Sequence, residues 1–141
     1  MRSDLVQAIK KLLAATGQFG SVIGLVGGDQ PVYPLARVWV KGCPKDDNFE
    51  NRPEAMLDLR VIVRLEAWLQ KDGDGNSIDG PLYNLADTAF NALHDIKLPG
   101  KGSLPLVVYD HPGLRAHNND GPTAHTMQVS ARVLPQSFSL T

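Results

Sequence analysis

The longest alternation of apolar and polar positions in the chain runs through residues 57–69, LDLRVIVRLEAWL. Every second residue from 57 to 69 is apolar, and successive side chains of a β-strand point to opposite faces of the sheet. The pattern therefore predicts a long strand with one face in a core. At roughly 3.3 Å per residue it would span about 43 Å, so we expect a bend or bulge within it. The opposite face is mixed, because charged residues share it with Ile62 and Trp68.

Three further segments have strand-like patterns. Residues 34–42, PLARVWVKG, place apolar side chains on one face and Arg37 and Trp39 on the other. Residues 124–134 alternate in the same way, and residues 104–109, LPLVVY, form a short apolar run. Strands with one apolar face are typical of an antiparallel sheet that is covered on one side.

Two segments have helical spacing instead. Apolar residues recur every three or four positions within residues 3–16 and again within residues 81–96, where Pro81 suits the first helical position. Residues 20–28, GSVIGLVGG, lack the ending of a phosphate-binding loop and are expected to be a flexible or strand-like connector. The sequence thus predicts an α+β fold, with one mostly antiparallel four-stranded sheet and two amphipathic helices on one face, in the order α-β-β-α-β-β.

We expect the 141 residues to form a single domain, with residues 135–141 as an extended C-terminal tail. Two interpretations of the tail are open. It is either a frayed end, or a segment that lies along a neighbouring subunit and is anchored there by Phe138 and Leu140.

Composition narrows the class of protein. A net charge of −1, from 14 basic and 15 acidic residues, argues against a protein that grips nucleic acid over its whole surface. Cys43 is the single cysteine, which excludes an intramolecular disulfide and fits a reducing compartment. Because no long apolar run or signal peptide is present, we expect a soluble, cytosolic protein without a membrane span.

Residues 71–83 contain a partial match to a calcium-binding loop. Asp72, Asp74 and Asn76 occupy its first, third and fifth positions, but Tyr83 stands where a bidentate glutamate is needed. Asp-Gly and Gly-Asn pairs are also strong turn formers. We therefore interpret these residues as a turn.

The remaining chemistry points away from catalysis. The spacing of His111, His117 and His125 matches no zinc module, and no nucleophile motif is present. We expect no metal, no cofactor and no catalytic residues. The alternative, a small cytosolic enzyme or ligand-binding α+β domain, would need an apolar pocket with convergent polar groups, which the sequence does not reveal.

The mixed strand faces are the candidate subunit interface, because a monomer rarely exposes tryptophans on an uncovered sheet. We expect the charged groups to pair across subunits, with the tail adding two anchors. For Trp68 the alternative is an isolated apolar side chain over the strand end. The expected interface residues are Arg37, Trp39, Asp58, Arg60, Arg64, Glu66, Trp68, Phe138 and Leu140.

Two long polar loops, residues 42–55 and 110–122, are the candidate contacts with other proteins. Both exceed an ordinary connection, and we expect them to be mobile in the free protein and to order against a partner. The expected contact residues are Lys45, Asp46, Asp47, Phe49, Glu50, Arg52, His111, Leu114, Arg115 and His117.

The order of these elements resembles that of the tail terminator (tail completion) proteins of tailed bacteriophages. The resemblance rests on the leading helix, the strands YPLARVWVKG and LDLRVIVRLEAWL, the helix PLYNLADTAFNALHDI and the two closing strands. It implies a homo-oligomeric ring, typically a hexamer, that caps the tail tube and joins it to the neck connector. It also implies that DNA passes through the lumen without sequence-specific binding.

The same resemblance implies a place in the virion, at the tail–neck junction, after assembly in the host cytoplasm. The expected partners are the tail tube protein and the neck connector protein. A rival within the same class is another neck or tail component, such as a stopper or a tube-like subunit. A tube subunit should polymerise into filaments, whereas a terminator should stop at a closed ring.

Overall fold

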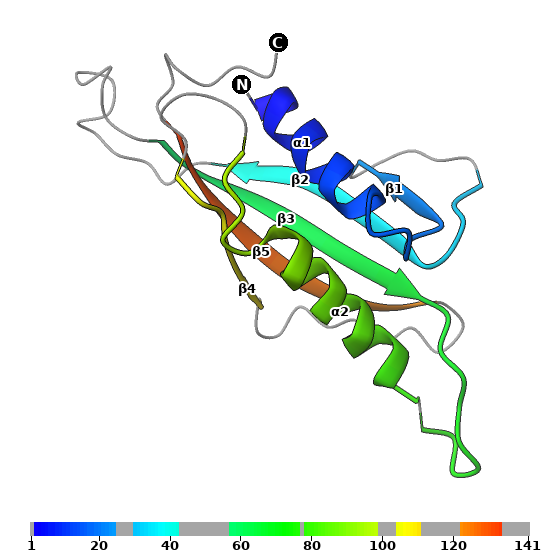
Figure 1. Cartoon of the computed structure of the whole chain (residues 1–141). Coiled ribbons are helices and arrows are strands. Elements are labelled where there is room, and N and C mark those ends of the chain that lie inside the picture. Colours follow the sequence, from blue (N-terminus) through cyan, green and yellow to red (C-terminus); the bar gives the residue numbers. More distant parts are fainter. Residues whose placement is uncertain are drawn as a thin grey trace.

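The computed structural model describes residues 2–24, 30–42, 57–76, 78–98, 104–110 and 122–133. The chain is α+β, as predicted, with two helices and a five-stranded mixed sheet within these ranges (Figure 1). The elements are α1 (Arg2–Ala14), β1 (Ser21–Ile23), β2 (Leu35–Gly42), β3 (Leu57–Ala67), α2 (Gly80–Leu93), β4 (Val107–Asp110) and β5 (Thr123–Val133).

The strands lie in the order β1-β2-β3-β5-β4. The four expected strands pair antiparallel, as predicted. The prediction of four strands misses β1, which adds to the edge of the sheet parallel to β2. The backbone N–H of Gly20 donates to the carbonyl of Pro34 at 2.8 Å at the start of this pairing. The strand-like alternative expected for residues 20–28 holds at Ser21–Ile23, but three residues are too few to show the alternating pattern that would place a strand there.

The centre of the sheet is the pair β3 and β5, whose register is unbroken from Leu57–Val133 to Ala67–Thr123. The bulge expected in the long strand is therefore absent from the pairing of β3 with β5. The register shifts in the neighbouring strand β2, between Val40 and Gly42. An extra residue in β2 lets that strand twist away while β3 stays regular.

Both helices pack on one face of the sheet, as predicted (Figure 1). Helix α1 contacts β1 and β2, and α2 contacts β3, β5 and β4. Among the described residues, no helix is both long and apolar enough to cross a membrane. The core between the layers includes Leu5, Ile9 and Leu13 of α1, Leu82, Ala89 and Leu93 of α2, and Val38, Leu59, Val61, Val63, Leu65, Met127 and Val129 of the sheet.

Helix α2 ends at Leu93, three residues before the predicted end at 96. Asp95 has a positive φ of 62°, and its N–H donates to the carbonyl of Leu106 at 2.8 Å. The N–H of Leu106 donates in turn to the carbonyl of Ile96 at 2.9 Å. The segment after α2 thus leaves the helix because its backbone pairs with the segment that enters β4.

The turn between β3 and α2 is held by Asp72. One of its carboxylate oxygens accepts the backbone N–H groups of Asp74 and Asn76, both at 2.9 Å. A backbone bond from Ile78 to Gln70 closes the base of the turn at 2.8 Å. The interpretation of these residues as a turn is confirmed, and its cause is the side-chain acceptor that mimics a backbone turn.

Candidate assembly face

The face of the sheet opposite the helices carries the mixed residues predicted from the sequence. Alternation along the paired strands places them in rows across the sheet. Within the described ranges, neither helix packs on this side. We call it the open face, and it consists of Leu35, Arg37 and Trp39 of β2, Asp58, Arg60, Ile62, Arg64 and Glu66 of β3, Val107 and Tyr109 of β4, and Ala124, Thr126, Gln128, Ser130 and Arg132 of β5.

Two ion pairs lie on the open face. The Arg37 Nε donates to Glu66 Oε2 at 2.8 Å, and the Arg60 Nη2 donates to Asp58 Oδ2 at 2.7 Å. Both acids have a partner in their own chain, and the expectation that they also pair across subunits stays a prediction. Each arginine lies close enough on the same sheet face to reach its acid, and this proximity is sufficient for pairing.

A hydrogen-bond network continues from Asp58 to the edge strand β4. The Ser130 hydroxyl donates to Asp58 Oδ1 at 2.6 Å, and the Gln128 amide donates to the Tyr109 hydroxyl at 2.6 Å. The Arg60 guanidinium also donates to that hydroxyl and lies 5.9 Å from the centre of the ring. Tyr109, Gln128 and Ser130 are not among the interface residues expected from the sequence, although alternation along β4 and β5 is the signal that places them on this face.

Arg64 differs from the other arginines of β3 and β2. It lies in register between Arg37 on β2 and Thr126 on β5, so its cross-strand neighbour is another cation. Its Nε atom is buried and has no hydrogen-bond partner among the described residues, as is also true of the Arg60 Nε. Arg60, however, is paired with Asp58 through another nitrogen, whereas Arg64 has no ion pair among the described residues. Like charges directly opposite are unfavourable, and a buried donor without an acceptor is costly. A carboxylate from another chain would give the Arg64 Nε an acceptor and would offset the repulsion between Arg64 and Arg37.

The open face also has an apolar centre. Ile62 is only 4% exposed and lies in register between the half-buried Trp39 and Gln128. Leu35 and Ala124 are buried on the same side, outside the main core cluster. An apolar centre with a polar, arginine-rich surround is typical of a protein interface.

Trp68 follows directly after the last residue of β3, and 60% of its surface is exposed. Its ring makes an edge contact with Tyr33, with centroids 5.9 Å apart and planes at 74°. Val32, which precedes Tyr33 in the chain, is also largely exposed. Trp68 is therefore part of a small exposed group at the end of the sheet, and not a solitary side chain.

Part of the predicted site lies outside the described residues. This holds for the tail anchors Phe138 and Leu140, and for all named contact residues of the two loops: Lys45, Asp46, Asp47, Phe49, Glu50, Arg52, His111, Leu114, Arg115 and His117. Of the histidines weighed as metal ligands, His125 is described, and its ring contacts that of Tyr83 at 6.4 Å. Within the ranges described, no three His, Cys, Asp or Glu residues gather as a metal site would need.

Comparison with known proteins gives no further identification. No protein-family model matches the chain, and no curated protein matches its sequence.

Proposed function

We propose that this protein is a structural subunit of a bacteriophage tail. Copies of it would form a ring, hexameric by the family resemblance, that caps the tail tube, ends its polymerisation and joins it to the head–neck connector. The ring would lie at the tail–neck junction of the virion after assembly in the host cytoplasm. DNA would pass through its lumen without sequence-specific contacts.

The observation that carries this proposal is Arg64 on the open face. Its buried Nε has no acceptor among the described residues, and Asp58 and Glu66 are paired with other arginines. A buried, unsatisfied donor costs about 1–3 kcal/mol, which a neighbour's carboxylate would recover. Ile62 is already buried within its own chain, so the apolar surface that a second copy would shield from water at this centre is that of the half-buried Trp39.

The geometry of such a contact favours a ring over a two-fold dimer. A self-complementary contact across a two-fold axis would bring the arginine-rich open faces of two copies together. Like-charge repulsion disfavours that arrangement, whereas a contact between the open face and a different surface of the next copy avoids it. Head-to-tail contacts close into a ring when the rotation between copies permits.

The function needs no reaction chemistry, since capping is a matter of matching surfaces. We propose that one rim of the ring contacts the last tube ring and the other rim the connector, through the loops at residues 42–55 and 110–122. The overall charge of −1 would let DNA slide through the lumen without a strong hold.

Electron microscopy of tube assembly tests the proposal. The tail tube protein of the same phage is allowed to polymerise with and without this protein, and tube lengths and ends are measured. A terminator should shorten the tubes and appear as a ring at one tube end. Filaments of the protein alone would identify a tube-like subunit instead. Tubes that grow unchanged, with no density at their ends, would contradict the proposal.

A further inference from the structure

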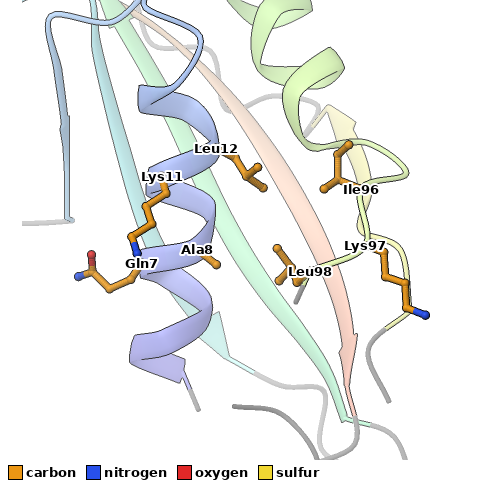
Figure 2. Close-up of a pocket in the computed structure, with 7 residues that line it drawn as sticks. All are labelled: Gln7, Ala8, Lys11, Leu12, Ile96, Lys97 and Leu98. Atoms are coloured by element: carbon orange, nitrogen blue, oxygen red, sulfur yellow. The ribbon is translucent and has the colours of Figure 1, made fainter. Parts of the chain in front are cut away.

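A groove lies on the helix side of the molecule, between α1 and the segment that follows α2 (Figure 2). Its volume is about 320 Å³. Leu12 and Ile96 face each other across it, and the buried side chains of Ala8 and Leu98 form its floor. This size and apolar lining fall at the lower end of the range for binding pockets.

The wall opposite α1 is fixed by backbone hydrogen bonds. The carbonyl of Ile96 accepts a hydrogen bond from the N–H of Leu106 at 2.9 Å. The carbonyl of Leu106 accepts one from the N–H of Asp95 at 2.8 Å. Leu98 is only 3% exposed and belongs to the main core cluster. Because this wall is anchored to the sheet and to the core, the groove is preformed.

Charge on the rim is of one sign. Lys11 stands on the α1 side and Lys97 on the opposite side, both exposed, while the remaining polar lining residue is the neutral Gln7. Figure 2 shows the two lysine side chains directed outward on either side of the apolar strip. Among the residues that the structure describes, no acidic side chain lines the groove.

We propose that this groove binds an acidic amphipathic helix of a partner protein. Apolar side chains on one stripe of that helix would fill the strip between α1 and residues 96–98, and acids on both flanks would meet Lys11 and Lys97. This is the helix-in-groove mode of recognition. It goes beyond the proposed ring, because the groove lies on the opposite side of the sheet from the open face and needs no second copy of the chain.

The arrangement of charge favours a helix over a fatty acid or similar amphiphile. A single-chain amphiphile carries its charge at one end, whereas the lysines here stand on both sides of the apolar strip. An apolar cavity of about 150 Å³ holds one benzene-sized group. A groove of about 320 Å³ therefore has room for about two large apolar side chains, which one helix presents at positions i and i+4.

The chain's own helices are poor candidates for this occupant. Helix α1 carries Lys10 and Lys11 against the single acid Asp4, and Asp87 is the single acid of α2. Since neither helix among the described residues has acids on both flanks of its apolar stripe, the proposed occupant is a helix of a different protein.

A pair of synthetic peptides tests this inference with the full-length protein. Each is an amphipathic helix of about 18 residues, with leucines on one stripe. One peptide carries glutamates on both flanks and its twin carries lysines. We expect the acidic peptide to bind about tenfold more tightly at low salt and to lose that preference as salt is raised. Among the methyl groups of leucine and isoleucine, NMR chemical-shift changes on peptide binding should be confined to Leu12, Ile96 and Leu98.

The charge reversal Lys11→Glu with Lys97→Glu should invert the preference, so that the lysine peptide binds more tightly. Lys71→Glu, at an exposed site in the β3–α2 turn, is the matched control and should leave the preference unchanged. Equal binding of both peptides, shifts outside the groove, or no binding of either peptide would overturn the inference. Decanoate that binds where the peptides do not would assign the groove to a small amphiphile instead. None of these outcomes depends on whether the protein forms rings.

Discussion

Glu66 accepts a hydrogen bond from Arg37 at 2.8 Å, and both belong to the same sheet face of one chain. Glu66 is only 8% exposed, so this acid is not available to a neighbour without breaking the pair. Asp58 is engaged in the same way by Arg60 and Ser130. Arg64 therefore differs from Arg37 and Arg60 of the open face in having no ion pair among the described residues, and in the proposed ring it is the group that would take an acid from a neighbouring copy.

Arg37→Ala should destabilise the fold by about 2 kcal/mol, because it leaves the Glu66 carboxylate nearly buried without its partner. Urea denaturation measures the free energy of unfolding. The matched control is Arg132→Ala, an exposed arginine on the same face, which should change stability by less than about 0.5 kcal/mol. Equal effects of the two substitutions would show that the Arg37–Glu66 pair contributes no more than an ordinary surface charge.

Gly20→Ala should destabilise the sheet edge. A Cβ atom at Gly20 would lie 2.5 Å from a methyl group of Val32 and 2.8 Å from its backbone oxygen. Because the backbone of Val32 cannot move aside easily, we expect a loss of about 1–3 kcal/mol in the free energy of unfolding. Gly73→Ala is the control, since nothing lies within 4 Å of a Cβ there. Hydrogen exchange at residues 21–23 should rise in the first variant alone, and unchanged exchange there would refute the role of this close approach.

Trp68→Ala should weaken the ring while the subunit stays folded. The side chain is largely exposed, and its contact with Tyr33 is worth about 0.5–1.5 kcal/mol. Leu65→Ala, at a fully buried position of β3, should instead cost about 2–5 kcal/mol and lower the melting temperature clearly. If Trp68→Ala unfolds the subunit, or leaves rings as resistant to dilution as the wild type, Trp68 is not an interface residue.

Asp72→Ala should cost about 1 kcal/mol, because two backbone N–H groups of the turn lose their acceptor. Asp72→Asn keeps a side-chain oxygen and should retain most of the stability. Thermal unfolding with and without calcium separates this account from the metal-loop alternative. A calcium-dependent rise in the melting temperature of the wild type, absent in Asp72→Asn, would favour the metal loop.

Much of the fold follows from local patterns. The alternation in residues 57–69 and 124–134 predicts the two central strands within two residues at each end, because one face of each is buried against the helices. The apolar stripe of residues 81–96 predicts α2 for the same reason. What local pattern does not contain is pairing between distant segments. The parallel addition of β1 and the early end of α2 at Leu93 both arise from backbone bonds to residues far along the chain.

Alternation along the strands places the expected sheet residues of the candidate site on one face, but it does not give their pairing. Alternation of side chains along each strand predicts that Arg37, Arg60 and Arg64 lie on one sheet face, and they lie together there in the structure. Asp58 and Arg60 lie two residues apart on β3, so their pairing is local. The Arg37–Glu66 pair instead depends on the cross-strand register of β2 and β3, which alternation alone does not specify. The groove between Leu12 and Ile96 was missed for a similar reason, since its far wall exists only because residues 95–96 pair with Leu106.

The most direct test of the central claim is the mass of the assembled protein, wild type against Arg64→Met, by sedimentation velocity over a dilution series. Methionine has a similar length but no donor, so the subunit should lose no stability. We expect the wild type to sediment as one closed ring and Arg64→Met to dissociate at a concentration at least about tenfold higher. A wild type that is monomeric throughout, or a variant whose rings survive dilution equally well, would contradict the account.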